Sequence, residues 1–209
     1  MGSEMCIRDS IRKSPHTNAD YGRKNRGYYQ KLNEAAAYKK GQRGYWEVVG
    51  DYIRTNSTPQ DTIYVWGWEP GIYVKAQRLC PAPKAFEGTM HTLTPEELSK
   101  RINELLTAFR KKPPKFIVDT HKNHYPWDRP PLELWPRTKK GFLPLNKQMI
   151  AQYDAAYSKI LREQIEPDEA LRYEAMAPFR EFVMNNYEIV PANFAKYVLF
   201  KRISPQPKQ

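Results

Sequence analysis

Three side chains that could bind a metal or transfer protons follow one short apolar segment of this 209-residue chain. The segment is Phe116–Asp119; it ends on a carboxylate, and His121 and His124 come just after it. One aspartate and two histidines can together bind a divalent metal or perform acid–base catalysis. No complete metal-binding motif surrounds them, however. The alternative interpretation is that Asp119 caps a turn while both histidines are solvated.

A second candidate site combines aromatic rings with a carboxylate. Trp66 and Trp68 flank a glycine, Glu69 follows directly, and Tyr73 comes a few residues later. Aromatic faces can stack on a sugar or a base, and Glu69 could accept hydrogen bonds from sugar hydroxyl groups. The structural alternative is that one tryptophan fills the core and the other covers the edge of a sheet.

Both candidate sites follow predicted strands. Thr62–Trp66 and Phe116–Asp119 are short apolar runs rich in β-branched and aromatic residues, which is typical of buried strands. Between them, Thr94, Pro95 and Glu97 match the start of a capped helix. A strand, a helix and a second strand form a βαβ unit, so we expect the two strands to be parallel. Ligands bind beyond the carboxyl ends of such strands, where both candidate sites fall.

The remaining patterns predict an α/β fold. Amphipathic or capped segments predict further helices, and two apolar runs near the C-terminus predict a hairpin. The predicted helices cover Tyr45–Ile53, Pro70–Arg78, Lys147–Arg162 and Asp168–Met184, and the predicted hairpin strands are Tyr187–Val190 and Tyr197–Lys201. We therefore expect a small, mainly parallel sheet with helices on both faces and an antiparallel C-terminal hairpin at its edge.

The segment Thr120–Leu145, between the second strand and the next helix, is predicted to be a loop. It contains five prolines together with Trp127 and Trp135. Loops of this length in compact domains are usually functional or disordered, and the interleaved aromatic residues indicate that this one packs on something. We predict that the functional face joins the turn at Trp66–Tyr73 to the start of this loop, Asp119–Trp127.

Composition divides the chain into four parts. The first ten residues, MGSEMCIRDS, resemble translated sequencing-adapter read-through, so residues 1–10 are interpreted as a sequencing artefact rather than as a disordered tail. Residues 11–43 are predicted to be a basic, partly helical linker, residues 44–203 the α/β domain, and residues 204–209 a disordered tail. Without the suspect segment, Cys80 is the one remaining cysteine, so no internal disulfide is expected.

The net charge of +11 is concentrated in two stretches. Residues 11–43 carry a net charge of +7 and residues 111–145 carry +5, whereas residues 44–110 are close to neutral. Such basic stretches can bind polyanions, for example anionic lipid headgroups, or can simply be solvated. The sequence holds no recognised nucleic-acid-binding motif, so a nucleic-acid partner is not expected.

Several signatures of self-sufficient enzymes are missing from the sequence. It holds no phosphate-binding G-x-x-x-x-G-K-[ST] loop, no G-x-G-x-x-G fingerprint, no G-x-S-x-G elbow and no cysteine pair at metal-ligand spacing. It also has no run of the roughly 18 to 20 apolar residues that a membrane-spanning helix needs. We therefore do not expect this chain alone to be catalytic.

Several runs of the chain resemble one family of membrane enzymes. The runs are Val49–Ile53, Thr58–Gly67, Pro70–Tyr73, Gln77–Arg78 and, near the C-terminus, Phe182–Val183, Asn186–Tyr187 and Leu199–Arg202. Over residues 45–202 the chain resembles the C-terminal soluble domain of bacterial GT-C membrane glycosyltransferases. That group includes the dolichyl-phosphate-mannose-protein mannosyltransferase-like and aminoarabinose-transferase-like proteins.

This resemblance implies that the chain is the extracytoplasmic C-terminal domain of a glycosyltransferase in the cell membrane. Members of the family use a polyprenyl-phosphate sugar donor, with or without a divalent metal. Their catalytic acidic residues lie in an extracytoplasmic loop near the first membrane helices, so the resemblance assigns no catalytic residue and no cofactor to this chain. The expected partners are the membrane domain of the same parent protein, a lipid-linked sugar or acceptor, and anionic lipid headgroups.

The alternative is a free-standing soluble basic α/β protein. It would be either a polyanion-binding module or a metal-dependent hydrolase that uses Asp119, His121 and His124. Apolar spans encoded upstream of Ile11 would favour the membrane parent, and a start codon near that position would favour the free-standing protein.

Overall fold

The computed structural model describes residues 43–85, 90, 92–121 and 129–203. By its contacts the chain divides into residues 1–44 and residues 45–209, and the elements described below belong to the second unit. Three predicted parts of the chain lie outside the described residues. They are the artefact at 1–10, nearly all of the linker at 11–43, and the tail at 204–209. Among the helices described, none is both long enough and apolar enough to cross a membrane.

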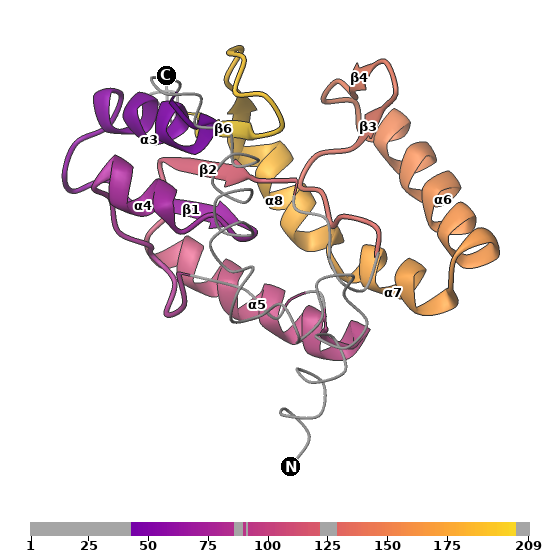
Figure 1. The fold of residues 1–209 in the computed structure, drawn as a ribbon. Coiled ribbons are helices and arrows are strands. Elements are labelled where there is room, and N and C mark those ends of the chain that lie inside the picture. The colour runs from indigo at the N-terminus through magenta and orange to yellow at the C-terminus, as the bar shows by residue number, and fades with distance from the viewer. Residues whose placement is uncertain (1–42, 86–89, 91, 122–128, 204–209) are drawn as a thin grey trace, which may run out of the picture. The chain divides into compact units, whose positions relative to one another are not determined.

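A four-stranded sheet forms the centre of this unit (Figure 1). Its strands are β1 (Ile63–Trp66), β2 (Phe116–Asp119), β5 (Tyr187–Ile189) and β6 (Val198–Arg202). They are arranged in the order β1-β2-β6-β5. The predicted parallel pairing of β1 with β2 is confirmed, and so is the antiparallel C-terminal hairpin at the edge of the sheet.

The expectation that the sheet is mainly parallel is wrong. Strand β6 pairs with β2 in the antiparallel direction, so β1 with β2 is the one parallel pair of this four-stranded sheet. The reason is topological. Parallel strands are joined by crossover connections, usually helices, and helices follow both β1 and β2. The strand that the second crossover leads to, β5, lies at the edge of the sheet rather than beside β2. Because the second strand of the C-terminal hairpin is the one beside β2, that half of the sheet is antiparallel.

Helices cover both faces of the sheet, which confirms the mixed α/β class (Figure 1). The helices are α3 (Tyr45–Thr55) and α4 (Gly71–Ala76) on one face, and α5 (Pro95–Lys111) and α8 (Ala177–Asn186) on the other. Ile63 and Val65 pack against the first pair, whereas Tyr64 and Trp66 pack against the second. Successive side chains of a strand point to opposite faces, so one continuous apolar run supplies two hydrophobic cores.

The two helices on the first face approach each other closely at Gly50. A Cβ atom at this position would lie 2.5 Å from the Cβ atom of Lys75 in α4, which is closer than real side chains come. Gly71 makes a similar approach to Trp46, because a Cβ atom there would lie 3.1 Å from its ring. Gly50 falls in one of the runs that carry the family resemblance, and helix packing accounts for it.

The helix between the two parallel strands, α5, begins with the predicted capping box. The side-chain oxygen of Thr94 accepts a hydrogen bond from the Glu97 N–H (3.3 Å), and the Glu97 carboxylate accepts one from the Thr94 N–H (3.0 Å). The buried face of the helix consists of Leu98, Ile102, Leu105, Leu106 and Phe109. The prediction for this segment is confirmed from its cap to its apolar face.

Two parts of the C-terminal half differ from the prediction. The segment predicted as one helix over 168–184 forms α7 (Pro167–Ala175) and α8, which separate at Met176. Pro178 lies in the first turn of α8, where its missing N–H breaks no helical hydrogen bond. The predicted loop over 120–145 contains a short ribbon, and a long helix follows it. These elements are β3 (Arg137–Thr138), β4 (Gly141–Phe142) and α6 (Lys147–Gln164).

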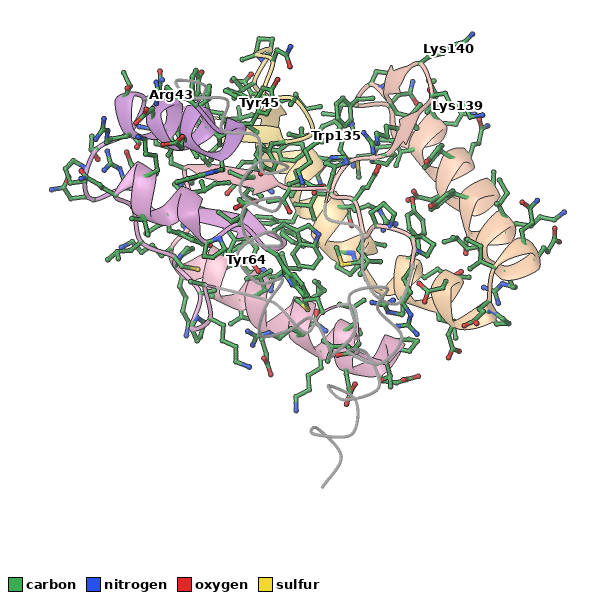
Figure 2. All side chains as sticks on the ribbon, viewed as in Figure 1. Arg43, Tyr45, Tyr64, Trp135, Lys139 and Lys140 are labelled. Atoms are coloured by element: carbon green, nitrogen blue, oxygen red, sulfur yellow. The ribbon has the colours of Figure 1, made fainter. Side chains whose placement is uncertain are left out.

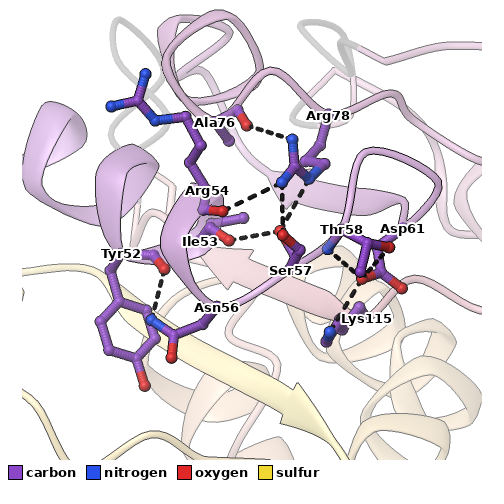
Figure 3. Close-up of polar contacts among 10 residues, drawn as sticks. All are labelled: Tyr52, Ile53, Arg54, Asn56, Ser57, Thr58, Asp61, Ala76, Arg78 and Lys115. Atoms are coloured by element: carbon purple, nitrogen blue, oxygen red, sulfur yellow. Dashed lines mark hydrogen bonds and ion pairs between the residues drawn. The ribbon is translucent and has the colours of Figure 1, made fainter.

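A buried arginine connects the end of α3 to the segment after α4 (Figure 3). Arg78 is only 7% exposed. Its guanidinium donates hydrogen bonds to the carbonyl oxygens of Arg54 (3.1 Å) and Ser57 (2.7 Å), and its Nε donates to the Ser57 hydroxyl (2.9 Å). Carbonyl groups at the end of a helix lack partners within the helix. Arg78 therefore closes the C-terminal end of α3.

A carboxylate beside this arginine organises the turn that leads into β1 (Figure 3). One oxygen of Asp61 accepts hydrogen bonds from the Thr58 N–H (2.7 Å), the Thr58 hydroxyl (3.0 Å) and the Lys115 ammonium (2.9 Å). Burial opposes ionisation, but these contacts outweigh it and lower the pKa of Asp61. Thr58, Asp61 and Arg78 all fall in runs that carry the family resemblance, and all three have structural roles.

Replacing Arg78 with methionine should destabilise the domain strongly. Arg78→Met keeps the apolar stem but leaves the carbonyl oxygens of Arg54 and Ser57 without their donor. An unsatisfied buried polar group costs about 1–3 kcal/mol, so we expect the free energy of unfolding to fall by roughly 3 kcal/mol in urea titrations. The matched control is Arg54→Met, because that side chain is 50% exposed and a surface ion pair contributes only about 0–1 kcal/mol. Equal losses in the two variants would contradict the role assigned to Arg78.

Candidate functional site

The parallel pairing brings the two predicted functional stretches together. In the register of the sheet, Trp66 at the end of β1 lies beside Asp119 at the end of β2. The next residue, Thr120, donates two hydrogen bonds to the carbonyl oxygen of Trp66, from its N–H (3.1 Å) and its hydroxyl (3.0 Å). We call the residues Trp66–Tyr73 and Asp119–His121 the β1–β2 rim. It is the edge where the sequence predicts a ligand site.

Two of the predicted aromatic residues are built into the scaffold. Trp66 is 6% exposed, its Nε1 donates a hydrogen bond to the Leu132 carbonyl oxygen (2.7 Å), and its ring packs edge-on against Phe179. The hydroxyl of Tyr73 accepts a hydrogen bond from the Val65 N–H (2.9 Å) and so covers part of the free edge of β1. The arrangement of Trp66 agrees with the interpretation that one tryptophan fills the core.

The next two residues, Trp68 and Glu69, are partly exposed at the rim. Gly67 makes this possible, because it turns the chain out of β1 with a φ of 116° that side chains disfavour. The carboxylate of Glu69 accepts a hydrogen bond from the Tyr197 hydroxyl (2.9 Å). Tyr197 lies just before β6, and the sequence predicts it only as a strand residue. The contact fixes a carboxylate beside an accessible aromatic residue.

Asp119 is a buried structural carboxylate. One of its oxygens accepts a hydrogen bond from the His121 N–H (2.9 Å), and the other accepts one from the Leu134 N–H (2.9 Å). Burial raises the pKa of Asp119, and the nearby His121 and the two backbone donors oppose that rise. These bonds agree with the interpretation that Asp119 caps a turn.

His121 lies between two carboxylates. Its side chain is 6% exposed, so the expectation that it is solvated is wrong. Nε2 lies 3.6 Å from an Asp119 oxygen and Nδ1 lies 3.3 Å from a Glu133 oxygen. Burial alone would lower the pKa of His121, but the carboxylates of Glu133 and Asp119 outweigh burial and raise it. A φ of 47°, which is uncommon for a residue with a side chain, holds the ring in this position.

An arginine completes this row of charges on the far side of Glu133. Arg137 Nε lies 2.9 Å from both carboxylate oxygens of Glu133, and one of its terminal nitrogens lies 2.6 Å from Oε1. Burial raises the pKa of Glu133, but His121 and Arg137 outweigh it and lower the pKa. We call Asp119, His121, Glu133 and Arg137 the charge row. The sequence does not single out Glu133 or Arg137; their only signal is an i,i+4 spacing inside a predicted loop.

A cavity of about 360 Å³ opens next to the charge row. His121 and Arg137 line one side of it, together with Phe142 of the ribbon. The turn of the C-terminal hairpin, including Tyr197, lines the other side. The residues that line the cavity therefore include the basic side chains of His121 and Arg137 and also Tyr197, whose hydroxyl orients Glu69.

His124 and Trp127 lie outside the described residues. Within the described part of the chain, no group of three or more His, Cys, Asp and Glu side chains is arranged to hold a metal ion. A site made of Asp119, His121 and His124 includes a residue outside that part, so it stays a prediction.

Comparisons with known proteins find a similarity to solved structures. No protein-family model matches the chain, and no curated protein matches it. Among solved structures, it is similar to the C-terminal globular domain of an oligosaccharyltransferase from Archaeoglobus fulgidus. The identity is 12% and the TM-score is 0.38, over 78% of this chain and 99% of that one. A TM-score this low carries no argument about this chain.

The two carboxylates of the charge row raise the pKa of His121. We expect His121 to titrate above the ordinary histidine pKa of about 6.5. Since the folded-state pKa is raised, the stability that this charge contributes is present below about pH 6.5 and is lost as the pH rises through the raised value. Glu133→Gln should lower the pKa of His121, because it removes one of the two partner charges.

Nuclear magnetic resonance of the imidazole signals measures this effect, with His121 assigned by the signals missing in His121→Asn. Glu163→Gln is the control, because Glu163 is 58% exposed on α6 and pairs with Lys159 instead. A His121 pKa that is the same with and without the Glu133 charge would refute the electrostatic argument.

Proposed function

We propose that residues 45–202 form the extracytoplasmic C-terminal domain of a polyprenyl-phosphate-sugar-dependent membrane glycosyltransferase. Within it, the β1–β2 rim contacts the acceptor or the lipid-linked sugar. The observation that carries the proposal is the partly exposed Trp68 beside Glu69, with the carboxylate held by the Tyr197 hydroxyl at 2.9 Å. An aromatic face and an oriented acceptor of hydrogen bonds are what a sugar ring requires.

The family resemblance supports this assignment through the scaffold. The resembling runs include Gly50, Asp61 and Arg78, and each of these residues has a specific packing or hydrogen-bonding role. A resemblance located in such residues concerns the fold of a domain rather than a set of catalytic groups. This agrees with a domain whose catalytic residues belong to another part of the parent protein.

The geometry of Asp119 also favours a binding role over hydrolysis. Both carboxylate oxygens of Asp119 are already engaged by backbone N–H groups. His121 is held between Asp119 and Glu133 with its side chain 6% exposed. Groups engaged in this way position the rim, and the partly exposed Trp68 and Glu69 are the residues that we assign to the ligand.

The proposal extends to partners and cofactor. The membrane domain of the same parent would carry the catalytic carboxylates, and it would bind the polyprenyl-phosphate sugar together with any divalent metal. This domain would need no cofactor of its own. The basic segment at 11–43, with its net charge of +7, would link it to the membrane domain and contact anionic lipid headgroups.

The first test is the gene itself, sequenced upstream of the codon for Ile11. We expect several apolar membrane spans, with a pair of acidic residues in the first outer loop. A short reading frame that starts near residue 11 would overturn the proposal. Hydrolysis that depends on an added metal would then support the alternative based on Asp119, His121 and His124.

The second test measures sugar transfer by the full-length protein. Trp68→Ala combined with Glu69→Ala should lower kcat/KM about tenfold or more, the scale expected from losing one charged hydrogen bond and one stacking contact. Tyr197→Phe, which removes only the hydroxyl, should give a smaller loss in the same direction.

The matched control replaces an apolar and an acidic residue elsewhere. Ile160→Ala combined with Glu163→Ala changes two exposed positions on α6, and it should leave transfer unchanged. Thermal unfolding of each variant separates loss of contact from loss of fold. Unchanged transfer by the well-folded Trp68 and Glu69 variant would refute the assigned role of the rim.

A further inference from the structure

A second cavity, of about 410 Å³, lies on the other side of Glu133 and Arg137. Its walls come from α6, from the segment 131–139 and from two buried residues, Tyr173 of α7 and Arg180 of α8. This volume is within the range of small-molecule sites, roughly 300 Å³ and above. The cavity is separate from the β1–β2 rim and does not depend on the function proposed for it.

Three tyrosines form the aromatic side of this cavity. The rings of Tyr153 and Tyr157, one turn apart on α6, stack with centroids 5.7 Å apart and planes 12° apart. Tyr157 packs edge-on against Tyr173, at 4.8 Å between centroids. Burial raises the pKa of both Tyr153 and Tyr157, and nearby negative charge acts in the same direction. Both hydroxyls therefore stay protonated and can donate hydrogen bonds to a ligand.

The lining of the cavity also includes three basic side chains. Arg180 is 2% exposed, lies 3.8 Å over the Tyr173 ring and donates a hydrogen bond to the Tyr173 carbonyl oxygen (2.7 Å). One of its terminal nitrogens lies 3.5 Å from an Asp154 carboxylate oxygen, and its Nε–H has no hydrogen-bond partner within the described residues. Arg137 and the exposed Lys139 add two positive charges at the entrance. Glu133 is the one carboxylate among the lining residues, and Arg137 already binds it.

From this geometry we infer that the cavity binds a sugar ring that carries an anionic group, either a carboxylate or a phosphate. The tyrosine rings offer apolar faces to the C–H groups of the sugar, and their hydroxyls can bond to its hydroxyl groups. The basic side chains attract the anionic group.

The spacing of the rings excludes a nucleotide base inserted between Tyr153 and Tyr157. A base held between two aromatic rings needs about 7 Å between them, which is two stacking contacts of roughly 3.5 Å. Tyr153 and Tyr157 are 5.7 Å apart and in contact with each other, so no base fits between them. A sugar can instead lie along the open face of the pair.

Calorimetric titration of the 209-residue chain tests the inference with five small molecules. The probes are glucuronate, glucose 6-phosphate, glucose, inorganic phosphate and AMP. We expect glucuronate or glucose 6-phosphate to bind about tenfold more tightly than glucose, which is the scale of one added charged hydrogen bond. The same ligand should also bind more tightly than inorganic phosphate. Any of three results would overturn the inference: AMP binds most tightly, phosphate binds as tightly as glucose 6-phosphate, or no sugar binds.

Two neighbouring lysines on the ribbon provide a matched pair of variants (Figure 2). Lys139 lines the cavity and Lys140, the next residue, does not. Both are exposed, so neither substitution endangers the fold. Lys139→Ala should weaken binding of the anionic sugar about threefold or more, as expected for one partly screened charge, and Lys140→Ala should leave it unchanged. Equal effects of the two substitutions would mean non-specific attraction and would refute the site.

A third variant tests the aromatic wall. Tyr153→Leu removes the ring and should weaken binding of both glucuronate and glucose, whereas Tyr153→Phe keeps the ring and should retain part of the affinity. Circular dichroism verifies the fold of both proteins. Full affinity in folded Tyr153→Leu would exclude the tyrosine pair as the sugar platform.

Discussion

The buried carboxylate of Asp119 is the constraint on which the functional edge depends. A buried charge is costly unless hydrogen bonds compensate it, and Asp119 obtains them from the N–H groups of His121 and Leu134. The bond to Leu134 requires a residue 15 positions later in the chain to lie at the end of β2. That bond places Glu133 beside His121 and brings Arg137 to Glu133. One desolvated carboxylate thus helps to position the whole charge row, and Arg137 of that row borders both cavities.

The sequence predicts those parts of the fold whose signals are local. The apolar run in β1, the run in β2 and the capping box at Thr94 each lie within a few residues, and each is observed. The direction of most of the sheet is not local. It depends on which strand of the C-terminal hairpin lies beside β2, and that pairing joins residues far apart in the sequence. The expectation of a mainly parallel sheet fails for that reason.

The candidate site is predictable to a similar extent. The proximity of Trp66 and Asp119 follows from the parallel pair, so their common edge could be predicted. The contact between Glu69 and Tyr197 joins residues 128 positions apart, and no sequence pattern connects them. Arg180 has the sequence character of a surface arginine on a helix, yet it is 2% exposed because an aromatic ring and a carbonyl oxygen surround it. Residues that act through distant partners need the folded chain to identify them.

Arg137 connects the two cavities physically. It borders both of them, and its guanidinium is bound to Glu133, which in turn faces His121. An anion that binds Arg137 from either cavity competes with Glu133 for the same donors. Once Glu133 loses part of that pairing, its negative charge acts more fully on His121 and favours the imidazolium. The rim and the tyrosine-lined cavity, although separate in space, therefore border one chain of charges that runs from Arg137 through Glu133 to His121.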